Sequence, residues 1–174
     1  MELFDAITKR HSYREHFKDE EVPVEDLKKI VKAGIQAPSG CNAQTTSFII
    51  VDDPELLKKM SSRLTSKAMA SAKAAIVVLY EMREVYHDFS FYKEDYAAAV
   101  QNMLLSITAL GYASVWLDGT LRLERRRHAI AKLLGVPKHL TVATLLPIGV
   151  PSVDVPKKER KPFEERAWFN GYNK

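Results

Sequence analysis

The chain is poor in the residues that build disulfides, zinc sites and glycine-rich phosphate loops. It has 174 residues, among them seven glycines and a single cysteine, Cys41. One cysteine excludes an intrachain disulfide and the cysteine-rich spacing of structural zinc sites. The glycines form neither G-x-G-x-x-G after a strand nor G-x-x-x-x-G-K-[ST], so a bound nucleotide must be held in some other way.

Membrane, secretory, metalloprotease and hydrolase signals are also missing. No apolar run approaches the roughly 18 residues that cross a bilayer, and residues 1–10 lack the basic start and apolar stretch of a signal peptide. We therefore expect a cytoplasmic protein with no membrane partner. The five histidines show no H-E-x-x-H pairing, so no metal site is expected. No G-x-S-x-G elbow supports a hydrolytic triad.

The overall composition is that of an ordinary globular protein with a basic excess. Hydrophobic residues make up 46% and charged residues 28%, and the length predicts one domain over residues 1–174. The net charge of +4 would attract a nucleotide cofactor, an acidic metabolite or nucleic acid. The basic runs at 122–128 and 157–161 are not interleaved with aromatics that stack on bases, so nucleic-acid binding is the minor alternative.

Apolar spacing predicts alternating helices and strands. We expect helices over residues 3–7 and 27–35, a helix from residue 54, and one from about 124 to 134. The longest should cover residues 96–110, with Asp95 as its N-cap and Gly111 at its end. Strands are expected over residues 48–51, 75–80, 113–117 and 142–148. This alternation predicts a sheet covered by helices on both faces.

Two short polar segments carry the chemistry. The first places Arg10, His11, Ser12 and Arg14 directly after a short helix. Arginine forks donate paired hydrogen bonds to phosphate, and a serine hydroxyl adds a neutral one, although a solvated basic turn has the same composition.

The second segment reads APSGCNAQ over residues 37–44. Its amide and hydroxyl side chains could meet the donors and acceptors at the edge of a planar ring, while its small residues let a ligand approach the backbone. An ordinary turn is the alternative interpretation. Cys41 has no resolving cysteine and is interpreted as a small spacer.

Taken in order, these segments resemble the FMN-dependent nitroreductase family. Its members carry R-x-S-x-R/K near the start, here RHSYR at 10–14, and then A-P-S-x-x-N-x-Q, here residues 37–44. The similarity continues through the alanine-rich helix, WLDG at 116–119, LGVP at 134–137, IGVP at 148–151 and KER at 158–160. It departs after Gln44, where many members have Pro-Trp and this chain has Thr-Thr-Ser.

The resemblance implies a fold and a divided site. The fold would be α+β, a three-layer α-β-α sandwich with a mostly antiparallel central sheet, in an interlocked homodimer with FMN at the subunit interface. Arg10, His11, Ser12, Arg14, Lys158 and Arg160 would bind the phosphate and ribityl end. Pro38, Ser39, Asn42 and Gln44 would come from the other subunit, and the backbone of Leu117, Asp118 and Gly119 would approach flavin N5.

The implied activity is hydride transfer from NAD(P)H through FMN to an acceptor such as a nitroaromatic or quinone. The flavin carries this chemistry, so no protein residue is assigned as catalytic. The aromatic stretch 82–94 could form a substrate lid through Tyr86, Phe89, Phe91 and Tyr92, or simply pack against a partner subunit. A specialised relative that dehalogenates, desaturates or consumes its flavin is the alternative from the same fold.

Overall fold

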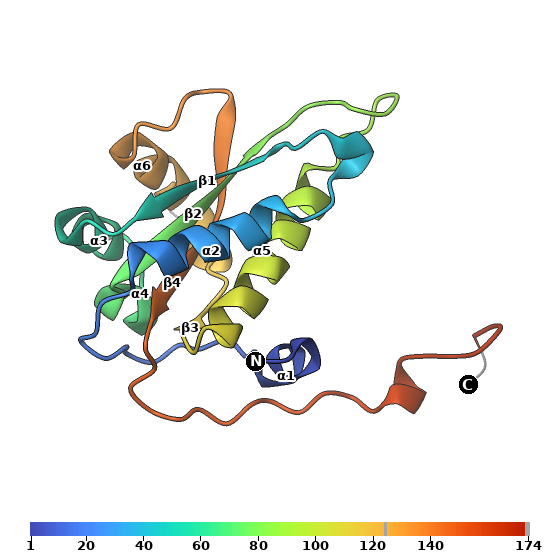
Figure 1. Cartoon of the computed structure of the whole chain (residues 1–174). Coiled ribbons are helices and arrows are strands. Elements are labelled where there is room, and N and C mark those ends of the chain that lie inside the picture. The colour runs from blue at the N-terminus through green and yellow to red at the C-terminus, as the bar shows by residue number, and fades with distance from the viewer. Residues whose placement is uncertain (124, 173–174) are drawn as a thin grey trace.

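The structure, a computed structural model, describes residues 1–123 and 125–172 and is built on an antiparallel sheet (Figure 1). Within these residues the strands β1 (Thr46–Val51), β2 (Ala74–Glu81), β3 (Ala113–Ser114) and β4 (Leu140–Gly149) are ordered β1-β2-β4-β3. Every neighbouring pair in this order is antiparallel.

Strand β2 explains why the sheet must be covered on both sides. Its residues from 74 to 79 are all buried, and they alternate between two hydrophobic clusters. Ile76 and Val78 face one cluster, whereas Val77 and Leu79 face the other. Successive side chains of a strand point to opposite faces, so a continuous apolar run requires a helical layer on each side.

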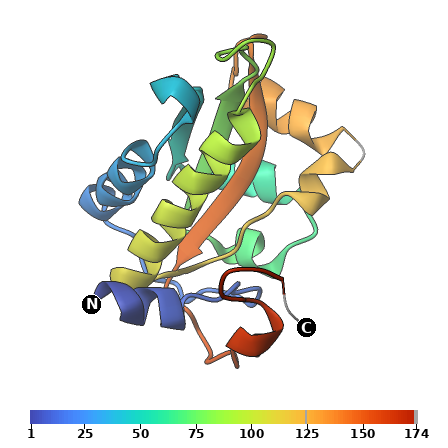
Figure 2. The same ribbon diagram turned by 90° about the vertical axis from the view of Figure 1, so that its right-hand side faces the viewer.

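Helices supply those two layers (Figures 1 and 2). On one face lie α2 (Val24–Ile35) and α5 (Tyr92–Ala109), with α1 (Leu3–Lys9) against α5. On the other lie α3 (Pro54–Ser61), α4 (Lys67–Ser71) and α6 (Arg126–Leu133). Short 3-10 turns follow at η1 (Gly40–Asn42), η2 (Gly119–Arg122) and η3 (Phe163–Glu165). The expected three-layer α-β-α sandwich is confirmed.

Some expected boundaries were wrong. Helix α5 begins at Tyr92, with Phe91 in the N-cap position, and Asp95 is a buried residue of its first turn instead of the cap. The strand expected over 113–117 pairs regularly only at Ala113 and Ser114, with an isolated bridge from Leu117 to Leu145. Helix α6 begins at Arg126, and the predicted start at Glu124 lies outside the described residues.

The basic segment after α1 is fixed to the end of the sheet by Phe17. Its ring packs so closely on Gly149 that a Cβ there would lie 2.5–2.9 Å from Phe17 atoms. Phe17 also bridges Pro151, and its backbone N–H donates to Ser71 Oγ at 2.8 Å. Only a residue without a side chain fits between strand and ring.

Gly149→Ala is therefore expected to lower the free energy of unfolding by about 1–3 kcal/mol, the usual cost of overpacking. Equilibrium urea denaturation measures the effect. Gly119→Ala is the matched control, because no atom lies within 4 Å of a Cβ built there. Equal stability of the two variants would contradict the packing described here.

Candidate functional site

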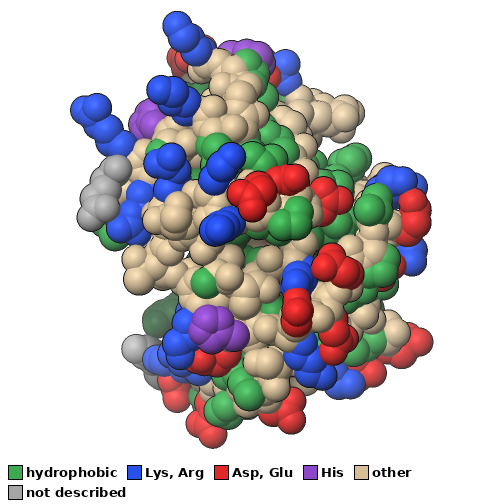
Figure 3. Space-filling view, turned by 90° about the vertical axis from the view of Figure 1, so that its left-hand side faces the viewer, with side chains coloured by type: hydrophobic (Ala, Val, Ile, Leu, Met, Phe, Trp, Pro, Cys, Tyr) green, Lys and Arg blue, Asp and Glu red, His purple; other side chains and the backbone are tan. Residues whose placement is uncertain are grey.

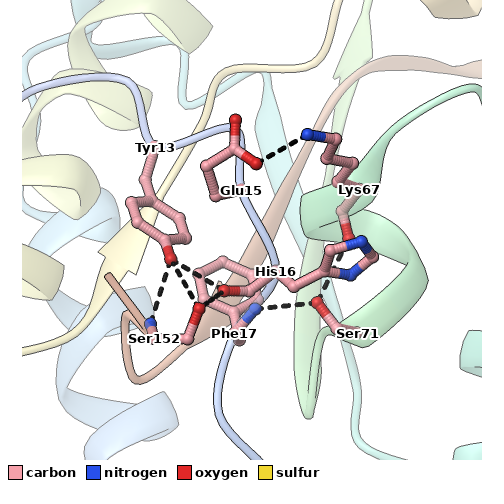
Figure 4. Close-up of polar contacts among 7 residues, drawn as sticks. All are labelled: Tyr13, Glu15, His16, Phe17, Lys67, Ser71 and Ser152. Carbon is pink, nitrogen blue, oxygen red and sulfur yellow. Dashed lines mark hydrogen bonds and ion pairs between the residues drawn. The ribbon is translucent and has the colours of Figure 1, made fainter. Parts of the chain in front are cut away.

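Tyr13 anchors the segment that carries the predicted phosphate-binding residues (Figure 4). Its side chain is 1% exposed and stacks on Phe17 with ring centroids 5.2 Å apart. The hydroxyl donates to the His16 carbonyl at 2.7 Å and accepts from the Ser152 backbone N–H at 3.0 Å. The second bond joins the segment to the chain just after β4, 139 residues later in the sequence.

This junction brings the tail back across the basic segment. A cavity of about 460 Å³ lies between the two stretches. It is lined by His11, Ser12, Arg14, Glu15, Val155, Pro156, Lys157, Lys158 and Arg160. The early and late residues predicted to bind one phosphate thus meet in a single hollow, with the exception of Arg10.

Arg10 precedes His11 of this cavity, and its guanidinium is repelled by the charge of Arg160. Burial, and to a smaller degree the nearby Arg160, lower the pKa of the Arg10 guanidinium, which still stays charged at neutral pH. Five cationic side chains thus gather at one place: Arg10, Arg14, Lys157, Lys158 and Arg160. Like charges at close range repel, so this arrangement favours an anionic ligand.

His11 supplies an unsatisfied polar atom at the same place. Its Nδ1 donates to the Lys9 carbonyl at 3.0 Å, which orients the ring. Its Nε2 is buried and has no hydrogen-bond partner within the described residues. A buried nitrogen without a partner is costly. With Nδ1 donating, Nε2 of the neutral ring would accept from a ligand hydroxyl, whereas Nε2 of the imidazolium would donate to a phosphate oxygen. The donor set therefore fits the phosphate end of FMN.

A second cavity of about 370 Å³ continues from the first and shares Arg14 and Glu15 with it. Its remaining walls come from two stretches, Thr65 to Lys67 and Trp116 to Thr120. The predicted residues Leu117, Asp118 and Gly119 thus lie beside the cationic cavity.

Thr65, Ser66 and Lys67 are site residues that sequence reasoning missed. Ser66 caps α4 by accepting from the Met69 N–H at 3.2 Å, and Lys67 Nζ lies 2.7 Å from Glu15 Oε2 (Figure 4). This ion pair balances the acid next to Arg14. The one available signal was a serine before a five-residue helix, which is too short to show helical periodicity.

The segment 117–119 is fixed beside the cavity by hydrogen bonds to Asp118 and Leu117. The Asp118 carboxylate accepts from Arg122 Nε at 3.1 Å and from Arg127 Nη2 at 3.2 Å. Thr144 Oγ1 donates to the Leu117 carbonyl at 2.8 Å. Arg127, in the basic run at 122–128, is thus paired with Asp118, and its side chain is only 25% exposed.

The second predicted segment forms a strained loop at η1. Cys41, Asn42 and Gln44 all have positive φ, between 51° and 53°, a conformation uncommon outside glycine. Pro38, Ser39 and Gln44 line a small pocket of about 60 Å³, whereas Asn42 is exposed outside it. Non-glycine strain of this kind concentrates at functional sites. Cys41 is exposed, and its interpretation as a spacer stays a prediction.

The two predicted segments do not meet within one chain. Helix α5 has 18 residues, a length of about 27 Å. Both ribbon views place α1 and the start of the basic segment at its C-terminal end and η1 at its N-terminal end (Figures 1 and 2). One copy of the chain therefore holds the cationic cavity and the amide loop, residues 37–44, at separate places.

The four predicted lid residues also fall into two groups. Tyr86 and Phe89 pair across a tight turn and are 55% and 61% exposed. Phe91 packs on Gly40, and Tyr92 stacks on Tyr80 with centroids 4.4 Å apart. Tyr86, which packs edge-on against His87, and Phe89 are thus the two exposed rings among the four.

Other kinds of site find no support in the described part of the chain. The face drawn in Figure 3 mixes basic and acidic side chains, unlike the basic stripe of a nucleic-acid-binding surface. Outside residues 124 and 173–174, no helix is long and apolar enough to span a bilayer. Over the same residues, histidine, cysteine and acidic side chains form no metal-binding cluster.

The fold is an α+β sandwich with a cationic cavity, and comparisons with known proteins place the chain more closely. The nitroreductase family model matches residues 7–92 and 61–150. A "Putative NADH dehydrogenase/NAD(P)H nitroreductase" of Archaeoglobus fulgidus is 37% identical over 170 residues, which are 97% of this chain and 94% of that protein. The chain therefore belongs to the nitroreductase family.

Two further relatives show the range of this similarity. A structure from Desulfovibrio desulfuricans, solved in complex with FMN, superposes with a TM-score of 0.82 at 28% identity and covers 99% of both chains. An iodotyrosine deiodinase of Thermotoga neapolitana is 28% identical over 177 residues, which are 91% of this chain and 93% of that protein.

Tyr13→Phe removes the hydroxyl that joins the basic segment to Ser152. The variant should lose about 0.5–1.5 kcal/mol of stability, because the Ser152 N–H loses its acceptor and the His16 carbonyl keeps only the bond from Ser152 Oγ. Urea denaturation measures the loss. Tyr172→Phe, at a site that is 68% exposed, should leave stability unchanged. An unaltered midpoint for Tyr13→Phe would argue against the hydroxyl as an anchor.

Proposed function

We propose that the protein is an FMN-dependent oxidoreductase. Bound FMN would supply hydride transfer at N5, taking the hydride from NAD(P)H and giving it to an acceptor such as a nitroaromatic or quinone. The observation that carries this proposal is the cationic cavity lined by Arg14, Lys158 and Arg160 together with His11, whose Nε2 has no hydrogen-bond partner in the described residues. The FMN complex of the Desulfovibrio relative supports the choice of flavin.

The phosphate end would lie among residues from both ends of the chain. Arg14 can donate two parallel hydrogen bonds, and charge-assisted bonds of this type are about twice as strong as neutral ones. Arg10 and Arg160 would lose part of their mutual repulsion when a dianion lies between them. Ser12 adds a neutral donor, and Lys158 adds a point charge. FMN would therefore be held by its charged tail without a glycine-rich loop.

The adjoining cavity provides a place for the ring system. Arg127 binds the Asp118 carboxylate and Thr144 binds the Leu117 carbonyl, which fixes the segment. The Leu117 N–H donates to the Leu145 carbonyl at 3.0 Å, so the donors offered to a ring would be the Asp118 and Gly119 N–H groups. A preorganised donor near N5 would stabilise charge that develops on the ring during reduction. Lys67, paired with Glu15, stands on the opposite wall. The roles of these residues are binding and electrostatics.

We also propose a homodimer, since one copy lacks a complete site. The amide loop with Ser39 and Gln44 lies far from the cationic cavity in the same chain, so a second copy would have to bring it there. Exposed apolar groups support such an interface. They are Leu3, Phe4 and Ile7 on α1, together with Phe163, Phe169 and Tyr172 on the tail. The tail runs away from the body of the molecule (Figure 1), which suits an interlocked pair.

The names of relatives support the reductant and leave the acceptor open. The Archaeoglobus relative is named for NADH and NAD(P)H chemistry, whereas the Thermotoga relative is named a deiodinase. A hydride acceptor would reach the flavin beside the hairpin around Tyr86 and Phe89, whose free rings could stack on it. Product analysis with nitroaromatic, quinone and halogenated substrates separates a general reductase from a dehalogenase.

Purified protein is expected to bind FMN, and Arg14→Ala should weaken that binding by tenfold or more. The reason is the loss of charge-assisted bonds worth about 1.5–3 kcal/mol each, at about 1.4 kcal/mol per factor of ten. Fluorescence titration gives the dissociation constants. Arg63→Ala, at an exposed site that lines neither of the two cavities, is the control. Unchanged affinity in Arg14→Ala, or wild-type protein that binds no flavin, would refute the assignment.

The protein should sediment as a homodimer, at twice the 19.7 kDa of one chain. Burying the exposed rings of α1 and the tail would drive association, since apolar burial contributes about 25 cal/mol per Å². Phe4→Glu, at a residue that is 79% exposed, should shift the protein towards monomer and reduce its flavin content together. Sedimentation velocity measures the first and absorbance the second. A wild-type monomer that holds one FMN per chain would contradict this prediction.

A further inference from the structure

Asp95 is a buried acid for which neither the fold nor the proposed chemistry gives an obvious use. It is 3% exposed in the first turn of α5, and its carboxylate forms no ion pair within the described part of the chain. Instead Oδ1 accepts from the Gly40 backbone N–H at 2.8 Å, and Oδ2 accepts from Thr45 Oγ1 at 2.6 Å. A buried carboxylate is costly unless its oxygens are bonded.

The two donors bracket the strained loop. Gly40 stands before the positive-φ residues Cys41 and Asn42, and Thr45 follows the third such residue, Gln44. Residues held in the left-handed region persist only when their surroundings fix them. Charge-assisted bonds are stronger than neutral ones, so one carboxylate can hold both ends of the loop.

Neighbouring contacts make the same junction rigid. Phe91, one turn before Asp95, packs so tightly on Gly40 that a Cβ there would lie 2.3–2.8 Å from its atoms. The Glu81 N–H donates to the Thr45 carbonyl at 2.9 Å, and Arg83 contacts the Ala43 carbonyl. The loop is thus fastened to the start of α5 and the end of β2.

The pocket beside this junction is lined by a residue with an unsatisfied hydroxyl, which a ligand would satisfy. Asp95, Ser39, Gln44 and Thr46 share its lining. The Thr46 hydroxyl is buried and has no hydrogen-bond partner among the residues described. Both Asp95 oxygens are occupied by the loop, so Asp95 acts on a ligand through the loop.

We propose that Asp95 is a positioning residue, which holds the loop at residues 39–45 in the shape that meets the flavin ring and ribityl chain. This inference rests on the proposed FMN function. It assigns the loop to the part of FMN that riboflavin shares, whereas Arg14 serves the phosphate that riboflavin lacks. The two roles are therefore separable by ligand.

The test compares dissociation constants for FMN and riboflavin in wild type, Asp95→Ala, Asp95→Asn and Arg14→Ala. Asp95→Ala should weaken both ligands by the same factor, tenfold or more, and Asp95→Asn should recover part of the loss because it keeps an acceptor for Gly40. Arg14→Ala should weaken FMN alone. Glu94→Ala, at the exposed neighbouring residue, is the matched control and should bind like wild type. Unchanged binding, or a loss confined to FMN in Asp95→Ala, would overturn the proposal.

Hydrogen exchange of the apo protein separates positioning from general stability. In Asp95→Ala, amides of residues 40–45 should exchange faster while those of β2 and β4 keep their wild-type rates. Uniformly faster exchange would mean a merely structural role and overturn the proposal. Thr45→Val gives the same readout if Asp95→Ala does not fold. If wild type bound neither flavin, the proposed function would fail, whereas this measurement would still report whether Asp95 holds the loop.

Discussion

The structure depends on cationic side chains being held close together in spite of their repulsion. Arg10 and Arg14 precede α2, whereas Lys158 and Arg160 follow the sheet, and the Tyr13 hydroxyl joins the two stretches through His16 and Ser152. Burial and, to a smaller degree, repulsion by Arg160 both lower the pKa of Arg10. An apolar core that fixes Tyr13 and Phe17 thus creates a concentration of positive charge that a phosphate would relieve.

A second constraint follows from where the helices place the remaining polar groups. Helix α5 separates the cationic cavity from the amide loop, so neither end of the molecule can enclose a flavin by itself. The strain at Cys41, Asn42 and Gln44 shows that the loop is held in an unusual shape. Asp95 and Phe91 fix that shape from α5, and a second copy of the chain would bring it to the cationic cavity. In this account folding, cofactor binding and association depend on one another.

The sequence predicts most where burial is simple and least where distant residues meet. The apolar run in β2 and the spacing within α5 gave reliable elements, because burial on defined faces controls both patterns. Asp95 was misjudged as a cap because its partners, Gly40 and Thr45, lie 55 and 50 residues away.

The candidate site shows the same division. The early arginines and the late KER run could be placed together only through the family resemblance, and the structure now gives their junction at Tyr13. Lys67 was not predicted as a site residue, because its five-residue helix is too short to show a helical repeat of apolar residues. Arg127 is one of several basic residues in a row, and only the fold shows that Asp118 pairs with it. Such contacts join residues that are brought together by the fold, so the local sequence pattern does not predict them.

The central claim, a flavin site shared by two chains, is tested most directly by mixed dimers. One chain carries Arg14→Ala and the other carries Asn42→Gly with Gln44→Gly, which removes the amides while glycine tolerates the positive φ. The two chains are co-expressed and purified as a heterodimer through two different tags. One of its two sites then combines the Arg14→Ala cavity with the altered loop, whereas the other combines an intact cavity with an intact loop. The account predicts one tightly bound FMN per heterodimer, although each parent homodimer binds weakly. Heterodimers that bind as weakly as their parents would show that each chain builds its own site, and would contradict it.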